Sequence, residues 1–415
     1  MLKPLSIVIV VSLAIAAVPQ QPHSAALLDH ARELLKQTPL IDGHNDYPWA
    51  LREKAHRNFE KLDIAKPQPT IMTDVPRLRA GGVGGQFWSV YVPVELEGQT
   101  AVTATLEEID TVHQMVRRYP ETFELALTAD DIERIFKQGR IASLIGMEGG
   151  HSIDNSLAAL RMFHRLGARY MTLTHSKNTA WADSATDDPK FGGLAPFGEE
   201  VVREMNWLGM LVDLSHVSPE TMEDAIRVSQ APVIFSHSSA RALNDVPRNV
   251  PDTVLRLLPK NGGVVMVTFV PGFLSPTVAA WNKLQDAERG RLTRQFGANG
   301  TEVTRGVDEW TTAHPAPRAT LSEAADHVDY IRKIAGIDHI GLGSDFDGIT
   351  AVPTGLEDVS KYPSLVAELL RRGYKDDEIK KILGQNVLRV MHEVEKVSKR
   401  LQSERGPSTV LFQQQ

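Results

Sequence analysis

The chain has 415 residues, of which 42% are hydrophobic, so it can bury a large core in one large domain or in a few smaller ones. Its net charge of −7 and the lack of a long basic run argue against a nucleic acid as partner, because phosphate binding needs a clustered positive surface. The absence of cysteine excludes disulfide bonds and cysteine-linked lipids. We expect small-molecule substrates.

The N-terminus has the features of a secretory signal. Lys3 precedes an apolar stretch from Leu5 to about Val18, which contains small residues that suit a signal peptidase. The stretch is too short to span a bilayer comfortably, although an uncleaved membrane anchor is the alternative. We predict a cleaved signal peptide at residues 1–25, with an approximate boundary, and a periplasmic or secreted protein. The C-terminal residues show no hydrophobic anchor signal, so we expect no stable membrane anchor.

Short apolar runs alternate with segments of helical periodicity along the chain. The runs lie at residues 40–46, 84–92, 141–148, 170–175, 210–216, 233–237, 264–269 and 339–345. The helical segments lie at residues 106–118, 130–137, 156–166, 196–207, 219–228 and 321–335. Strand, loop and helix recurring in this order indicate parallel βαβ units. Eight such units close a (β/α)8 TIM barrel, which is the predicted α/β fold.

Two stretches interrupt this repeat. Residues 56–76 are mixed in composition and contain proline, and residues 271–317 are long and polar. We interpret both as βα-loop insertions, which either shape the site of a barrel or form variable surface. Helices predicted at 362–372 and 375–394 complete the fold. The sequence thus divides into the signal peptide at 1–25, a single barrel domain at 26–398 and a flexible tail at 399–415.

Apart from the run at 84–92, six of the seven runs end in a residue that can bind a metal or move a proton. The C-terminal ends of barrel strands meet at one mouth, so these side chains should share a pocket. His44 and Asp46 lie two residues apart, on one face of a strand. Glu148, flanked by glycines, could bridge two ions, and His216 and His237 suit the second ion. Singly, each histidine fits a structural role equally well, but the five residues together favour a metal-dependent hydrolase.

Other residues are candidates for catalysis or substrate binding. His175 could be a metal ligand or could donate a hydrogen bond to a substrate carbonyl, where it would stabilise developing charge. Asp345 is the candidate general base, but Asp347 would also face inward, and spacing does not choose between them. Arg248 lies in a proline-flanked loop and suits a substrate carboxylate, with a surface arginine as the alternative.

Several motifs, in a fixed order from about residue 38 to about residue 395, resemble those of the membrane dipeptidases, also called renal dipeptidases, of the amidohydrolase superfamily. They are Ile41-Asp-Gly-His-Asn-Asp46, Glu148-Gly-Gly-His-Ser-Ile153, Tyr170-Met-Thr-Leu-Thr-His-Ser176, Trp181-Ala-Asp183, Asp213-Leu-Ser-His216, Ser236-His-Ser-Ser239, Arg248-Asn-Val-Pro-Asp252, Gly343-Ser-Asp-Phe-Asp-Gly348 and Gly355-Leu-Glu-Asp-Val-Ser-Lys-Tyr-Pro363.

The resemblance implies a metal-dependent (β/α)8 barrel and a role for each candidate residue. Two zinc ions would be bridged by Glu148, one completed by His44 and Asp46, the other by His216 and His237. His175 would bind the substrate carbonyl and the tetrahedral intermediate. Asp345, rather than Asp347, would be the acid/base, and Arg248 would hold the C-terminal carboxylate of a dipeptide. The family hydrolyses dipeptides, often with a C-terminal D-residue, and some members open β-lactam rings.

The chain also departs from the mammalian members of that family. They are disulfide-linked and lipid-anchored dimers, whereas this chain has no cysteine, so a non-covalent homodimer is the expected assembly. Residues 271–317 look longer than the matching segment, and Phe273 replaces a tyrosine near the substrate. We predict a zinc-dependent dipeptidase acting through metal-activated hydroxide. An amidohydrolase of N-acyl-D-amino acids or β-lactams, and a barrel without catalysis, are the alternatives.

Overall fold

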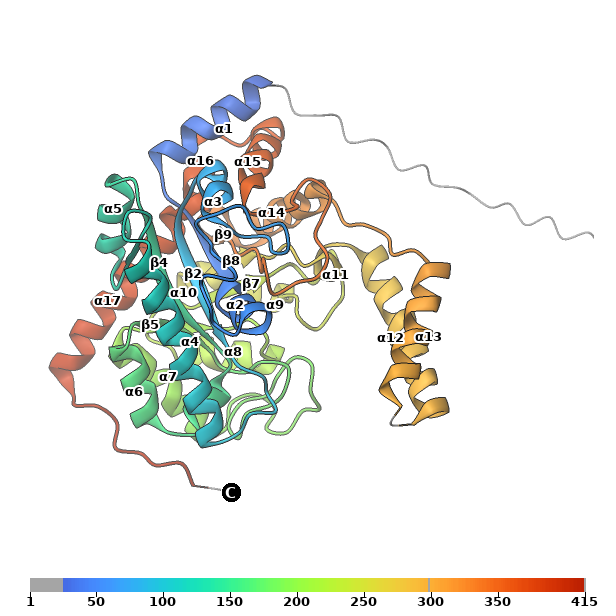
Figure 1. Cartoon of the computed structure of the whole chain (residues 1–415). Coiled ribbons are helices and arrows are strands. Elements are labelled where there is room, and N and C mark those ends of the chain that lie inside the picture. The colour runs from blue at the N-terminus through green and yellow to red at the C-terminus, as the bar shows by residue number, and fades with distance from the viewer. Residues whose placement is uncertain (1–24, 298, 414–415) are drawn as a thin grey trace, which may run out of the picture.

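A computed structural model describes residues 25–297 and 299–413 (Figure 1). The predicted signal peptide lies outside the described residues except at Ala25, where helix α1 begins. No helix in the described ranges is long and apolar enough to cross a membrane.

Eight parallel strands close into a barrel, which confirms the predicted (β/α)8 fold. Their sequence around the barrel is β2-β1-β9-β8-β7-β6-β5-β4, and β4 pairs with β2 to close it. The strands are β1 (Leu40–Asn45), β2 (Val83–Tyr91), β4 (Ile141–Glu148), β5 (Ala168–Thr172), β6 (Leu211–Asp213), β7 (Ile234–Ser238), β8 (Val264–Val267) and β9 (Ile340–Leu342). Nearly all of their residues are buried, as expected for parallel strands covered on both faces.

Strand β3 (Phe123–Leu125) was not predicted from the sequence. It pairs in parallel with the first residues of β4. The later residues of the same edge of β4 pair with β5. Three residues are too few to show a period of two, so no apolar run marks this strand.

The described residues form the following helices, most of which surround the barrel on its outer side (Figure 1). They are α1 (Ala25–Gln37), α2 (Tyr47–Ala55), α3 (Val75–Gly81), α4 (Gln99–Arg118), α5 (Ala129–Lys137), α6 (Leu157–Arg165), α7 (Pro196–Leu208), α8 (Pro219–Val228), α9 (Asp252–Leu255), α10 (Leu258–Asn261), α11 (Pro271–Leu274), α12 (Pro276–Phe296), α13 (Gly300–Ala313), α14 (Leu321–Ala335), α15 (Tyr362–Arg371), α16 (Asp376–Lys380) and α17 (Asn386–Glu404). Short 3-10 turns lie at Gly150–Ile153, Ile337–His339 and Val359–Lys361, and a π-helical turn at Lys381–Gln385 joins α16 to α17.

The C-terminal part of the chain differs from the sequence prediction. Helix α17, expected to end near Val394, continues to Glu404, so the predicted boundary at 398 falls inside a helix. Beyond it, the Ser408 amide donates to the buried carboxylate of Glu204 at 3.0 Å, and the Phe412 ring lies 5.2 Å from the Phe197 ring. These contacts fasten the last described residues to helix α7.

The two interruptions of the repeat take different forms. Residues 56–76 form a loop that leads into α3, whereas residues 271–317 are largely helical. Helices α12 and α13 pair as a hairpin that projects from the barrel (Figure 1). This hairpin has a small apolar cluster of its own, made by Leu292, Val303 and Val307. Near its start, α12 also contributes Val278 to the main core.

The separate cluster predicts that the hairpin can unfold without the barrel. Leu292 is 4% exposed, and Leu292→Ala should destabilise the hairpin by about 2 kcal/mol or more, because a large buried side chain is lost. Hydrogen exchange of residues 276–313 should then become faster, while exchange of the barrel strands stays unchanged. The control is Leu284→Ala in the same helix, where the side chain is 61% exposed. Faster exchange throughout the barrel would contradict this independence.

Candidate metal centre and active site

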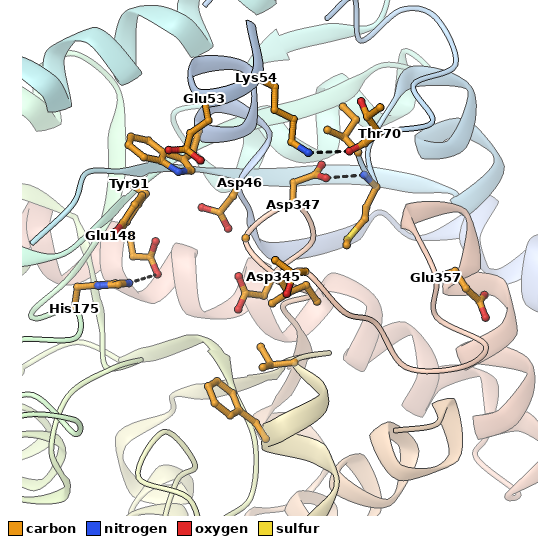
Figure 2. A pocket seen from close by; sticks show the side chains of 18 of the residues that line it. Asp46, Glu53, Lys54, Thr70, Tyr91, Glu148, His175, Asp345, Asp347 and Glu357 are labelled. Carbon is orange, nitrogen blue, oxygen red and sulfur yellow. Dashed lines mark hydrogen bonds and ion pairs between the residues drawn. The ribbon is translucent and has the colours of Figure 1, made fainter. Parts of the chain in front are cut away.

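A cavity of about 950 Å³ opens at the C-terminal ends of the barrel strands (Figure 2). Its walls include most of the residues that the sequence singled out, namely Asp46, Glu148, His175, His216, Arg248, Asp345 and Asp347. His44 and His237 are buried directly beside Glu148. The structure therefore brings every predicted site residue to one mouth, as the barrel topology requires.

Glu148, the last residue of β4, is the centre of this cluster. Its Oε1 lies 3.0 Å from His216 Nε2, 3.5 Å from His237 Nε2 and 3.6 Å from His175 Nε2. Its Oε2 lies 3.5 Å from His44 Nε2. Burial opposes ionisation of this carboxyl, but the surrounding imidazoles, His44 foremost, outweigh burial and hold its pKa well below the usual range.

The donor atoms of the cluster form three groups, each spanning no more than 4.8 Å. The groups are His44 with Glu148 and His237, Glu148 with His175 and His216, and His44 with Asp46 and Asp345. His237 therefore faces His44 as well as His216, whose Nε2 lies 2.9 Å from its own. His175 also lies in one of these groups. The geometry is therefore compatible both with a metal ligand and with a hydrogen-bond donor to the substrate carbonyl.

These donors fit divalent cations that prefer nitrogen and oxygen ligands. Burial lowers the pKa of His216 and His237 well below the ordinary value, and the neutral imidazole is the form that binds a metal. His44 Nε2 is buried and has no hydrogen-bond partner among the described residues. This nitrogen lies 3.3 Å from Asp46 Oδ2 and 3.5 Å from Glu148 Oε2, so a metal ion could take the place of a proton between them.

Hydrogen bonds at the opposite ring nitrogens orient two of these imidazoles. His44 Nδ1 lies 2.8 Å from the Tyr170 hydroxyl, and His237 Nδ1 lies 2.8 Å from Ser236 Oγ. Ser236 Oγ in turn donates to Asp213 Oδ2 at 2.7 Å. The Tyr170 hydroxyl likewise donates to the Gly43 carbonyl at 3.3 Å. Both hydroxyls therefore accept from Nδ1–H, which leaves Nε2 free for a metal. A Cβ at Gly146 would overlap the Tyr170 ring, so a glycine in β4 allows the tyrosine to cross the barrel.

These supporting residues, above all two fully buried aspartates, were not predicted from the sequence. Asp213 receives hydrogen bonds from Thr172 Oγ1 at 2.5 Å and from Ser236. Asp42 receives them from the Tyr362 hydroxyl and Ser344 Oγ, both at 2.6 Å. Each aspartate precedes a strand-end histidine by two or three residues, a spacing that could have identified them.

The structure separates the two aspartates of the β9 loop, which spacing could not. Asp345 has a carboxylate oxygen in the group with His44 and Asp46, and burial raises its pKa well above the usual range. Asp347 is directed instead toward Met72, whose amide donates to its Oδ1 at 2.6 Å (Figure 2). A Cβ at Gly348 would collide with the carboxylates of Asp46 and Asp345, so glycine permits their approach.

Arg248 is not the surface arginine that the sequence left as an alternative, since it is 5% exposed. Its guanidinium donates to the His237 carbonyl at 3.3 Å and Ser238 Oγ at 3.4 Å, and lies 5.2 Å from the Phe273 ring centre. Burial lowers its pKa to about 10, at which it still carries a charge at neutral pH. A buried cation on a cavity wall, held by neutral groups, suits an anionic ligand group.

The network around His237 yields a test of metal binding. Ser236→Ala removes the group that accepts from His237 Nδ1 and should weaken metal affinity about 10-fold or more, because the ring loses its orientation. Calorimetric titration of the metal-free protein with zinc would measure the change. Ser239→Ala is the matched control, because its buried Oγ has no hydrogen-bond partner among the described residues. Equal affinities for both variants would contradict this role.

Comparisons with known proteins agree with the geometry. The family model for membrane dipeptidases, peptidase family M19, matches residues 28–405. Dipeptidase verJ of Clonostachys rogersoniana is 42% identical over 385 residues, which cover 90% of this chain and 89% of that protein. The crystal structure of the probable dipeptidase PvdM from Pseudomonas aeruginosa has a TM-score of 0.80 and 27% identity, covering 90% of this chain and 100% of that one.

A metallo peptidase from Rhodobacter sphaeroides, solved with a phosphinate mimic of the dipeptide L-Ala-D-Ala, has a TM-score of 0.71 and 25% identity. The match covers 86% of this chain and 99% of that one. The family match spans nearly the whole chain, and the relative that covers 90% of it is named a dipeptidase. The chain therefore belongs to the membrane dipeptidase family, peptidase family M19, and is a metallopeptidase of the dipeptidase type.

Proposed function

We propose that the protein is a zinc-dependent enzyme that hydrolyses the peptide bond of free dipeptides, including those with a C-terminal D-residue. The observation that carries this proposal is the juxtaposition, in one cavity, of the imidazole cluster around Glu148 and the buried cation of Arg248. The Rhodobacter sphaeroides relative, bound to its L-Ala-D-Ala mimic, supports the extension to D-residues.

Glu148 would bridge two zinc ions, with His44 and Asp46 on one side and His216 and His237 on the other. Bound there, the metal pair supplies an activated hydroxide and polarises the scissile carbonyl. Manganese and cobalt also accept such ligands, so zinc itself rests on the family resemblance.

The remaining side chains would divide the work of binding and proton transfer. Asp345 moves a proton to the departing nitrogen, a task suited to a carboxyl whose pKa is raised. His175 lines the cavity and donates to the substrate carbonyl oxygen. Arg248 holds the C-terminal carboxylate of the dipeptide, while acidic groups near the metals receive its free amine. Fixing both ends selects a two-residue chain.

Three further features are proposed from the sequence. The predicted leader directs the protein to the periplasm or the outside of the cell. Dipeptides are the partners we expect, together with a second copy of the chain in a non-covalent homodimer. Sedimentation of the purified protein would test the homodimer.

Release of amino acids from a small panel of substrates tests the reaction. Gly-D-Ala and Gly-L-Ala should be cleaved by the zinc-loaded protein, and an N-acetylated copy and a tripeptide should not. Asp345→Asn should lower kcat at least about 100-fold, because a proton-transfer group is lost. Zinc content of the variant is the control. Cleavage of the acetylated substrate would indicate a deacylase instead, and cleavage of none would remove the proposed function.

A second variant tests the carboxylate site. Arg248→Met should raise KM for Gly-D-Ala about 10- to 100-fold, because a charge-assisted hydrogen bond to the substrate is lost. Dipeptide amides, which lack the carboxylate, should lose much less. Arg256→Met is the control, because that arginine is exposed, follows α9 directly and pairs with Asp252 at the start of that helix. Equal losses for acid and amide substrates would argue against this role.

A further inference from the structure

Asp347 is the carboxylate of the β9 loop that the proposed reaction leaves without a role. Its Oδ1 accepts the Met72 amide hydrogen at 2.6 Å, and the Thr73 side chain is a second hydrogen-bonding neighbour of the carboxylate. Figure 2 shows the side chain pointing away from Asp46 and toward the neighbouring chain segment. The acceptor is a charged group in a low-dielectric setting, which makes this hydrogen bond stronger than one between neutral groups.

The segment that Asp347 holds forms one wall of the cavity. Thr70, Ile71 and Met72 all line it, and they belong to the insertion at residues 56–76. The Met72 carbonyl accepts a second hydrogen bond from the Val359 amide at 3.3 Å. Both polar groups of the Met72 backbone are thus bound by the chain that follows β9, so the position of this wall depends on that chain.

The backbone around Asp347 is held in an unfavourable conformation. Asp345 and Asp347 have φ values of 67° and 69°, in the left-handed region that non-glycine residues rarely adopt. Such strain persists only where surrounding contacts impose it. The Asp345 amide donates to the His44 carbonyl at 3.1 Å, and the Asp347 carboxylate accepts from Met72. The same loop therefore presents Asp345 to the metal cluster and Asp347 to the wall.

We propose that Asp347 is a positioning residue that fixes the cavity wall at Ile71 and Met72, and so determines how well the enzyme uses dipeptides with large side chains. The proposal rests on the proposed dipeptidase function. Substrates that reach the wall gain contacts from it, whereas glycyl substrates do not. Release of the Met72 amide would let the wall shift, and small displacements of positioning groups reduce turnover.

The test compares D347A with D347N, whose amide oxygen can still accept the Met72 hydrogen. In D347A, kcat/KM for dipeptides with leucine or phenylalanine at either position should fall about 10-fold, and kcat/KM for Gly-Gly should change less than about 3-fold. D347N should restore most of the loss. E357A is the matched control, since it removes another cavity carboxylate, one that accepts from Gly355 in its own loop.

Hydrogen exchange of residues 66–74 supplies a readout that does not need activity. It should become faster in D347A and stay slow in D347N and E357A.

M72A shortens the side chain in the wall but keeps the hydrogen bond from the Met72 backbone. It should therefore reproduce the kinetic loss without the change in exchange, and it tests the proposal even if D347A does not fold. Equal loss for all substrates with unchanged exchange would overturn the proposal. So would a D347N variant as defective as D347A. If the wild-type enzyme cleaves no dipeptide, the proposed function fails, and exchange alone decides whether Asp347 holds the wall.

Discussion

The structure of the active site depends on one buried carboxylate. Glu148 is placed by β4 among four imidazoles, and its negative charge is stable there only because His44, His175, His216 and His237 surround it. Burying an isolated carboxylate would be costly, so either protonated imidazoles or metal ions must balance the charge. Burial lowers the pKa of His216 and His237, so these rings are neutral, whereas Tyr170, Asp46 and Glu148 outweigh burial and raise the pKa of His44. A protonated His44 therefore balances the charge in the metal-free protein, and bound metal ions would take over that role. Removing Glu148 would leave the histidines without the group that brings them together.

The barrel makes such a cluster possible because parallel strands deliver distant residues to one end. The position of a histidine at a strand end does not by itself orient its imidazole ring. Buried hydroxyl and carboxylate groups below the mouth of the barrel provide that orientation. Asp213 with Ser236 fixes His237, and Tyr170 fixes His44. These polar groups are fully buried, so each must be hydrogen-bonded. The same hydrogen bonds join neighbouring strands and orient the metal-binding histidines. Stability of the strand ends and geometry of the site are therefore linked.

The loops that follow the strands add the remaining side chains of the cavity to the metal-binding cluster. The loop after β7 contributes Arg248, buried and charged, against Phe273 at the root of the α12–α13 hairpin. The loop after β9 contributes Asp345 toward the metals and Asp347 toward the 56–76 insertion. Three loops distant in sequence thus share one cavity. Arg248 makes one wall cationic, the candidate metal ligands form the floor, and a second wall is attached to the β9 loop. The hairpin, with its own apolar cluster, lies outside this arrangement.

The sequence by itself determined the barrel, because each of the eight buried strands forms a continuous apolar run. It also determined the candidate ligands, because the end of each apolar run marks the end of a strand. The short β3 left no such signal, and the end of α17 was misplaced because polar residues of its last turns are held by tertiary contacts. Spacing left Asp345 and Asp347 equivalent and the family resemblance favoured Asp345, but only the tertiary structure shows that the backbone turns the two side chains to different neighbours. It alone identified Asp42 and Asp213 as supports, because a hydrogen bond across a barrel joins residues that have no fixed relation along the chain.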